Sequence, residues 1–307
     1  MESFMKQILT FTLVLSFFIL MLCFPQTTFL GASKGLLLWF QTLLPTLLPF
    51  MIISNLLICT NSVGYISRFL KPLFQRLFCI SERACYPVLV GFLCGYPMGA
   101  KAVADCTRMN HISKEEGQYL LSFCNNTSLM YIMSFLVLQN FKDSSLLLGT
   151  LFILLLSPIL CSFLFRHFSS KSTRQHTLSQ RNNHLIFHFQ IVDDSIMNGF
   201  ESITKIGGYV ILFSILFAIG EQFPFKWFLP ALEITGGTTT IFSWNLPFQR
   251  TYPLVLSLTS FGGVCSIAQT YSMIQGSGLS IKPYIIQKLI TAMVTSLLAF
   301  SYVLLSH

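Results

Sequence analysis

Long runs of hydrophobic residues, separated by short polar stretches, follow one another along almost the whole chain. Such runs are typical of membrane proteins, because about 20 helical residues cross the hydrocarbon core of a bilayer. Glycine interrupts three of the runs, which predicts broken or re-entrant helices there. We therefore expect an all-α integral membrane protein, a polytopic helix bundle with about seven to nine membrane segments in two repeat-like halves. The uninterrupted runs are 8–24, 113–138, 144–165, 206–219 and 281–305, the run 35–59 contains two prolines, and the glycine-interrupted runs are 84–106, 228–245 and 252–274.

The first part of the chain predicts three kinds of helix. The run 8–24 ends at Pro25 without the small residues of a signal-peptidase site, so we expect a retained helix rather than a cleaved signal. Pro45 and Pro49 lie near the centre of 35–59 and predict a kinked or broken helix. Between residues 65 and 80, basic and apolar side chains alternate at the helical spacing of a segment that lies on the cytoplasmic membrane surface.

A capping box marks the start of another helix. Ser113 stands three residues before Glu116, the spacing at which a serine at the N-cap accepts a hydrogen bond from the third residue of a helix. The sequence then stays compatible with a helix to about residue 138. We therefore expect one spanning helix over 113–138.

Composition and charge support this class and add a topology. The chain is 53% hydrophobic and 10% charged, whereas an average soluble domain is about 25% charged, which excludes an ordinary soluble enzyme. The net charge of +8 falls largely on the loops 68–83 and 166–181, and basic loops of helical membrane proteins face the cytoplasm. A re-entrant 84–106 puts both loops on that side. The expected parts are a first membrane half 1–166, a basic cytoplasmic loop 167–194 and a second membrane half 195–307.

The chain carries no pattern that predicts catalysis or metal binding. The nine cysteines lie mainly inside apolar runs without a C-x-x-C pair, so we interpret them as apolar packing residues. Four histidines in the loop 167–194 fit no ligand spacing, and we expect no metal. Because no nucleophile with a base and no phosphate-binding loop is present, we expect no enzyme, no cofactor and no nucleic-acid partner.

The most specific polar pattern is the string from Gly95 to Lys101. Its glycines allow close backbone approach, and a break frees backbone N–H and C=O groups to face a ligand. A cationic lysine beside freed N–H groups suits a carboxylate or a phosphate. Alternatively, the glycines only permit tight helix packing, while Lys101 extends to the interface or pairs with Asp105 one turn later.

Three further groups of polar residues stand in apolar surroundings. Residues 125–128 lie about 18 Å into their predicted helix, near mid-bilayer, where they contact either a ligand or a neighbouring helix. Glu233, beside a glycine pair, either binds a coupling cation or proton or is solvated at headgroup depth. For Ser266 and Gln269, after the last glycine break, ligand contact and packing both remain open. The candidate substrate-binding residues are Gly95, Tyr96, Pro97, Gly99, Lys101, Asn125, Asn126, Thr127, Ser128, Glu233, Thr235, Gly236, Ser266 and Gln269.

These motifs resemble a known family. The strings 91–101 (GFLCGYPMGAK) and 123–128 (FCNNTS) are similar to YlbJ-like sporulation integral membrane proteins, which carry the nucleoside transporter/FeoB GTPase Gate domain. The similarity extends to 44–50 (LPTLLPF), to 233–237 (EITGG) and to the glycine pair before Ser266. The resemblance places a Gate-like motif at 84–140. It implies transport or gating in endospore-forming bacteria, with dipicolinate moved toward the forespore by the sporulation members, and a multi-pass location in the mother-cell or forespore membrane. Homo-oligomerisation is likewise implied by the resemblance alone.

Residues and resemblance together favour a membrane transporter or gate for a small polar, anionic solute. We expect it to work by alternating access without ATP, surrounded by the lipid bilayer and with a coupling ion at Glu233. Two alternatives remain open. One is a nucleoside transporter, and the other is a non-transporting assembly factor for sporulation, in which the polar residues hold helices or a partner together.

Overall fold

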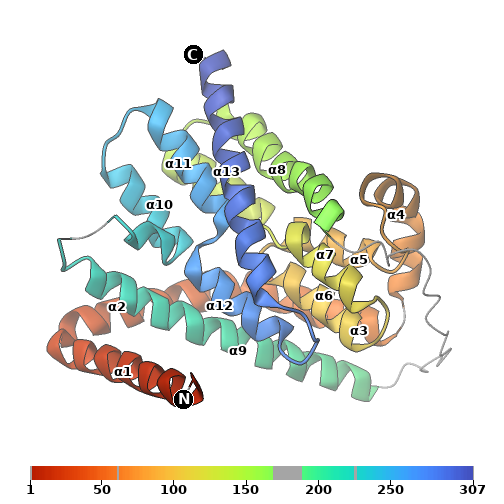
Figure 1. Cartoon of the computed structure of the whole chain (residues 1–307), viewed down its shortest axis with the longest axis horizontal. Helices are drawn as coiled ribbons and strands as arrows, with labels where there is room; N and C mark the ends of the chain where they lie inside the picture. The colour runs from red at the N-terminus through yellow and green to blue at the C-terminus, as the bar shows by residue number, and fades with distance from the viewer. Residues whose placement is uncertain (1, 61, 169–188, 225–226, 307) are drawn as a thin grey trace.

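The computed structural model describes residues 2–60, 62–168, 189–224 and 227–306, and in these ranges it contains helices and no strand. In Figure 1, α13 stands upright with α8 and α11 on either side of it, whereas α2 and α9 run across the lower part of the view, above α1. The large hydrophobic core lies among α3, α5, α6, α7 and α9, and a smaller one lies among η2, α8, α11 and α13. The first half comprises α1 (Glu2–Cys23), α2 (Pro25–Leu38), η1 (Trp39–Leu43), α3 (Leu44–Cys59), α4 (Val63–Phe78), α5 (Cys85–Cys94), α6 (Met98–Arg108), α7 (Lys114–Cys124), η2 (Tyr131–Phe141) and α8 (Leu146–Phe168). The second half comprises α9 (Phe189–Gly220), η4 (Leu229–Ala231), α10 (Ile234–Ser243), α11 (Phe248–Phe261), α12 (Gly263–Ile274) and α13 (Ile281–Ser306).

Five helical stretches of the described chain are long and apolar enough to cross a membrane. They are Pro25–Cys59, Leu146–Arg166, Phe189–Gly220, Phe248–Ile274 and Ile281–Leu305. This confirms the all-α, multi-span class. Three further apolar helices, Gln7–Cys23, Cys85–Cys94 and Tyr131–Phe141, are shorter than a full span.

Three prolines lie in the first helices. Pro25 occupies the first turn of α2, where its missing N–H is not needed. The kink predicted in 35–59 takes the form of the π-helical turn η1, which ends just before Pro45. A π-turn is a known way to bend a helix without ending it. The helical path therefore continues from α2 through η1 into α3, past Pro49.

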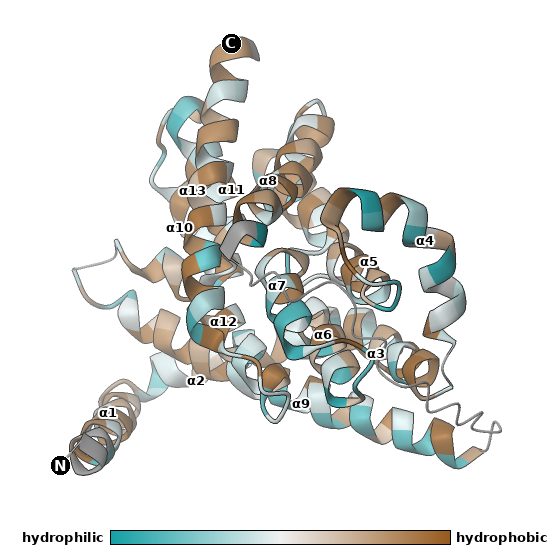
Figure 2. Cartoon of the chain, turned by 45° about the vertical axis from the view of Figure 1, so that its right-hand side comes forward, coloured by the Kyte–Doolittle hydropathy of each residue, from teal (hydrophilic) through white to brown (hydrophobic). Residues whose placement is uncertain are grey.

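The predicted interfacial helix is α4. Its apolar side chains do not all pack inside, since Tyr65 and Phe69 are exposed. Lys71 donates to Glu82 at 2.7 Å and so holds α4 to the turn before α5. Figure 2 shows polar residues along one side of α4, the two-faced arrangement expected at a membrane surface.

The glycine-rich string forms a helical hairpin. α5 and α6 pack against each other, and the turn between them contains Gly95 at φ +84°, a backbone conformation that favours glycine. A Cβ on Gly99 would stand 3.0 Å from the Cα of Gly91, so these two glycines mark the close crossing of the two helices. The break predicted in 84–106 is confirmed, and it reverses the chain direction.

The helix after the capping box is shorter than predicted. The Glu116 N–H donates to Ser113 Oγ at 3.1 Å, which confirms the N-cap. However, α7 ends at Cys124, residues 125–128 are non-helical, and the helix resumes as η2. The expectation of one helix over 113–138 was wrong, because Asn, Thr and Ser side chains offer the backbone and its neighbours other hydrogen bonds.

Glu116 links the start of α7 to the loop before α5. Its carboxylate accepts hydrogen bonds from Ser81 N (2.6 Å) and Ser81 Oγ (2.9 Å), and its side chain is buried outside the five spans. Burial raises the pKa of the Glu116 carboxyl above its ordinary value of 4.5, although the two Ser81 hydrogen bonds oppose the rise. The folded protein therefore holds the Glu116 proton more tightly than the unfolded chain does.

This pKa shift predicts a pH-dependent gain in stability for Glu116→Gln. A raised folded-state pKa means that stability falls as pH rises from the unfolded to the folded pKa, and glutamine removes that loss while still able to bond Ser81. We expect the difference in unfolding midpoint, Glu116→Gln minus parent, to increase as the pH is raised from about 4 to the raised pKa. Thermal unfolding in detergent at a series of pH values measures this difference. A difference that stays constant with pH would contradict the assignment.

The second half departs from the first at its glycine breaks. Gly262, at φ +83°, separates α11 from α12, yet these two helices continue as one apolar stretch instead of forming a hairpin. In the predicted segment 228–245, the helix begins after Glu233, so Gly236 lies inside the first turn of α10 rather than at a break. Of the predicted basic loop 167–194, residues 169–188 lie outside the described residues, and α9 already begins at Phe189.

Candidate functional site

Two helix breaks meet in the interior. The turn between α5 and α6 touches the non-helical residues after α7, because a Cβ on Gly95 would stand 2.5 Å from Ser128 N. A Cβ on Gly91 or Gly99 would overlap the carbonyl oxygen of Cys124, the last residue of α7. Only glycine therefore allows the hairpin to lie this close to the second break.

Asn125 connects three elements at this point. Its Oδ1 accepts from Ala100 N of α6 at 3.2 Å. Its Nδ2 donates to Thr270 Oγ1 of α12 at 2.9 Å and to Tyr284 OH of α13 at 2.8 Å. The side chain is 1% exposed, so these hydrogen bonds are made without competition from bulk water. Asn125 thus joins the first half of the chain to the second.

The other residues of the α7–η2 break are also hydrogen-bonded. Thr127 Oγ1 donates to the Thr259 carbonyl of α11 at 2.7 Å. Asn126 Nδ2 donates to the carbonyl of Phe123 at 2.7 Å, which leaves Asn126 Oδ1 to face the second half. Ser128 Oγ accepts from Tyr131 N and begins η2. Residues 125–128 therefore lie in a break rather than along the continuous helix that the sequence predicted.

Lys288 of α13 places a cation at the break. Its side chain is 1% exposed, and its Nζ donates to Asn125 O at 3.1 Å and to Asn126 Oδ1 at 3.4 Å. The ammonium also lies 4.9 Å from the centre of the Tyr96 ring, and Tyr96 OH donates to Ser260 O at 2.7 Å. Within the described parts of the chain, no carboxylate forms an ion pair with Lys288.

Lys101, the lysine that the sequence singled out, has a different environment. Its Nζ pairs with Asp105 at 2.9 Å and donates to Asn198 Oδ1 at 2.8 Å and Asn55 Oδ1 at 3.5 Å. The structure thus shows the pairing with Asp105 that the sequence left open as the alternative. Lys101 joins α6 to α3 and α9, and its charge is compensated.

Glu233 and its neighbours form a separate polar group. The Glu233 carboxylate caps α10 by accepting from Thr235 N at 2.9 Å and Gly236 N at 2.7 Å. The Cys265 N–H donates to the Leu232 carbonyl at 2.9 Å and so joins this turn to α12. Glu233 is buried rather than solvated.

Ser266 and Gln269 bond within their own helix. Ser266 Oγ donates to Gly263 O at 3.0 Å, and Gln269 Nε2 donates to Cys265 Sγ at 3.3 Å. A Cβ on Gly262 would meet both Ser266 and the Tyr96 ring, so the start of α12 borders the turn of the first hairpin. Pro97 follows Tyr96 in that turn and precedes α6.

Sequence reasoning missed Lys288, Thr270 and Tyr284. Lys288 had a usable signal, since an ionisable residue inside an apolar span is a functional candidate by default. Thr270 and Tyr284 carried none, because single Thr and Tyr residues are ordinary in membrane helices. In the described ranges no group of three or more His, Cys, Asp and Glu residues is arranged to hold a metal ion.

Comparison with known proteins finds two similarities. Residues 40–160 match the Gate family, which is described as nucleoside recognition. The chain is also 24% identical to the sporulation integral membrane protein YlbJ of Bacillus subtilis (strain 168), over 322 aligned positions that cover 91% of this chain and 79% of YlbJ. The predicted resemblance is confirmed. No solved structure matches the chain.

Only part of the site lies within the residues that match the Gate family. The α5–α6 hairpin and residues 125–128 fall within 40–160, whereas Thr270, Tyr284 and Lys288 lie after the matched residues. The similarity to an integral membrane protein and the apolar spans establish a multi-pass membrane protein. Its polar centre is built jointly by the Gate region and the last three helices.

Proposed function

We propose that this protein moves a small anionic solute across the membrane by alternating access, without ATP. The observation that carries the proposal is the buried Lys288 ammonium at the meeting point of two helix breaks. An uncompensated buried cation is costly in a low-dielectric interior, and an anionic ligand would remove that cost. A carboxylate is the simplest solute group that fits.

The backbone around Lys288 supports transport. Broken helices at membrane depth are tolerated where they line a cavity, and transporters use such breaks to hold solutes and ions. In the proposed topology the α5–α6 hairpin enters and leaves the membrane on the cytoplasmic side, as the basic loops require. Glu233, buried at the start of α10, is the proposed position of a coupling proton or cation.

Two observations support alternative functions. The Gate match, with its nucleoside-recognition description, suits a nucleoside. In contrast, Asn125, Asn126 and Thr127 all have partners within the chain, which suits an assembly factor whose polar residues only hold helices together. For an assembly factor, replacing Asn126 and Thr127 by alanine would change detergent stability or complex formation and no solute flux.

Uptake into proteoliposomes tests the proposal. We expect the purified chain to accumulate labelled dipicolinate, and not a labelled nucleoside, when an ion gradient is imposed. Empty liposomes and the Lys288→Gln variant are the controls. Nucleoside flux would move the assignment to nucleoside transport. Absence of flux for dipicolinate, other dicarboxylates and nucleosides under every gradient would favour the assembly factor.

A further inference from the structure

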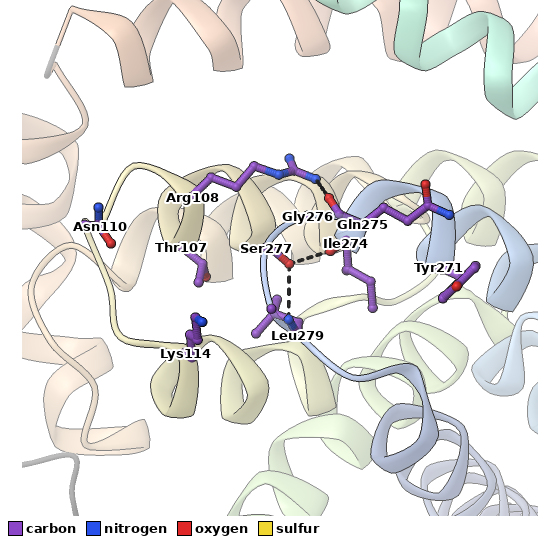
Figure 3. A pocket seen from close by; sticks show the side chains of 11 residues that line it. Thr107, Arg108, Asn110, Lys114, Tyr271, Ile274, Gln275, Gly276, Ser277 and Leu279 are labelled. Carbon is purple, nitrogen blue, oxygen red and sulfur yellow. Dashed lines mark hydrogen bonds between the residues drawn. The ribbon is translucent and has the colours of Figure 1, made fainter.

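A hollow lies at the end of the same helices. Its volume is about 590 Å³, and it is lined by the last turns of α6 and α12, the first residue of α7 and the loop 275–279. Figure 3 shows Arg108 and Lys114 on opposite sides, with Ser277 and the loop between them. The loop joins the spans Phe248–Ile274 and Ile281–Leu305, so the hollow opens at a membrane end and not toward lipid tails.

The lining is basic. Arg108 and Lys114 are its charged members, and no acidic residue lines the hollow. Asp105 stands behind Arg108 and pairs with it at 2.6 Å, but Asp105 is shared with Lys101 at 2.9 Å. Lys101, Arg108 and Lys114 carry three positive charges and Asp105 carries one negative charge, so the net charge of these four residues is +2. In the described chain, Lys114 has no hydrogen-bond or ion-pair partner, and its side chain lies along Gly278.

Hydrogen bonds fix the rim of the hollow. Arg108 Nη2 donates to the carbonyls of Met273 and Gln275, each at 2.6 Å. Gln118 Nε2 donates to Ser280 O at 3.0 Å, and Gln118 Oε1 accepts from Ser280 N at 2.8 Å. These contacts join α6 and α7 to the loop between α12 and α13.

The hollow and the polar centre share their walls. Thr270 lies one helical turn from Ile274 of the lining, and Tyr284 lies one turn after the Gln118 contact at Ser280. Both residues bond Asn125, the neighbour of Lys288. The lining of the hollow and the Asn125 and Lys288 group are therefore connected through α12 and α13.

We infer that this hollow is a binding site for small soluble anions, carboxylates above all, and that it serves as the cytoplasmic vestibule of the Lys288 site. Its role as a vestibule rests on the proposed transport, whereas anion binding in it does not. Unpaired Lys114 supplies the attraction, and Arg108 holds the loop that forms the opposite wall.

Charged thiol reagents can measure the local potential. Gln275 lines the hollow, is exposed and has ordinary backbone angles, so Gln275→Cys can be modified there. We expect an anionic methanethiosulfonate to react at least about fivefold faster than a cationic one at low salt, each rate being normalised to a free thiol. Adding Lys114→Gln should lower this ratio about threefold, whereas Lys142→Gln, an exposed lysine after η2, should leave it unchanged. Mass spectrometry of the modified peptide separates the introduced thiol from the native cysteines.

Protection by a ligand tests binding. In neutral detergent, millimolar dipicolinate should slow both reagents at Gln275→Cys, and the slowing should disappear with Lys114→Gln. No charge preference, an unchanged ratio after Lys114→Gln or no protection would overturn the site. If phosphatidylglycerol nanodiscs protect the thiol and free dipicolinate and phosphate do not, the hollow binds a lipid headgroup, and the inference of a soluble anion is wrong. The protection experiment does not measure flux, so the two proposals can fail separately. If proteoliposomes show no uptake but dipicolinate still protects Gln275→Cys, transport is rejected and the anion site is kept.

Discussion

Lys288→Gln is expected to lower dipicolinate uptake by about tenfold to a hundredfold. A hydrogen bond to a charged group contributes about 1.5–3 kcal/mol, which corresponds to this range in affinity. Glutamine can still donate to the carbonyl of Asn125, so the contact at the break survives while the charge is lost. Initial rates in proteoliposomes, corrected for the amount of inserted protein, measure the effect.

The stability of Lys288→Gln separates a functional lysine from a structural one. Because the ammonium is buried without a carboxylate, its removal should leave the unfolding midpoint unchanged or raise it. Lys282→Gln is the matched control, an exposed lysine on the first turn of the same helix, and should affect neither property. Unchanged uptake in Lys288→Gln would remove Lys288 from the site, and a parallel loss of uptake and stability would make it structural.

Gly91→Ala is expected to destabilise the protein by about 1–3 kcal/mol, with Gly91→Val worse. The added Cβ would overlap the carbonyl oxygen of Cys124, a backbone atom that cannot move aside as a flexible side chain does. The α5–α6 hairpin would have to separate from α7. Thermal unfolding in detergent and the yield of membrane-inserted protein measure this loss.

Gly208→Ala is the control for the glycine prediction. Gly208 lies in α9, and an added Cβ there meets no atom within 4 Å. Because alanine is a better helix former than glycine by about 1 kcal/mol, stability should be unchanged or slightly higher. Equal effects of the two substitutions would show that loss of helix flexibility, and not the close approach at Gly91, determines the result.

Local chemistry made several features predictable. Ser113 at the N-cap of α7 and the break at Gly95 between α5 and α6 are where residue type required them. The apolar runs 144–165 and 281–305 likewise predicted the spans Leu146–Arg166 and Ile281–Leu305, because burying a long uncharged helix in lipid needs no partner of defined shape. The Gate resemblance followed from the same strings.

Predictions from local sequence patterns failed where a helix boundary depends on contacts with residues far along the chain. Residues 125–128 looked compatible with a helix, yet Asn125 is held by Thr270 and Tyr284, which lie far along the chain. At Glu233 the glycine pair suggested a break, but a carboxylate that caps two N–H groups starts the helix there instead.

The order of residues was enough to establish the membrane class, most helix positions and the glycines that permit close approach, since these depend on hydrophobicity and on neighbouring residues. Which polar groups meet depended on the packing of the helices in space. That packing paired Lys101 with Asp105 and Asn198, and it brought Lys288 to the carbonyl of Asn125. The physical reason is that a hydrogen bond or an ion pair acts over a few ångströms in space, whereas these partners are separated by up to more than half the chain.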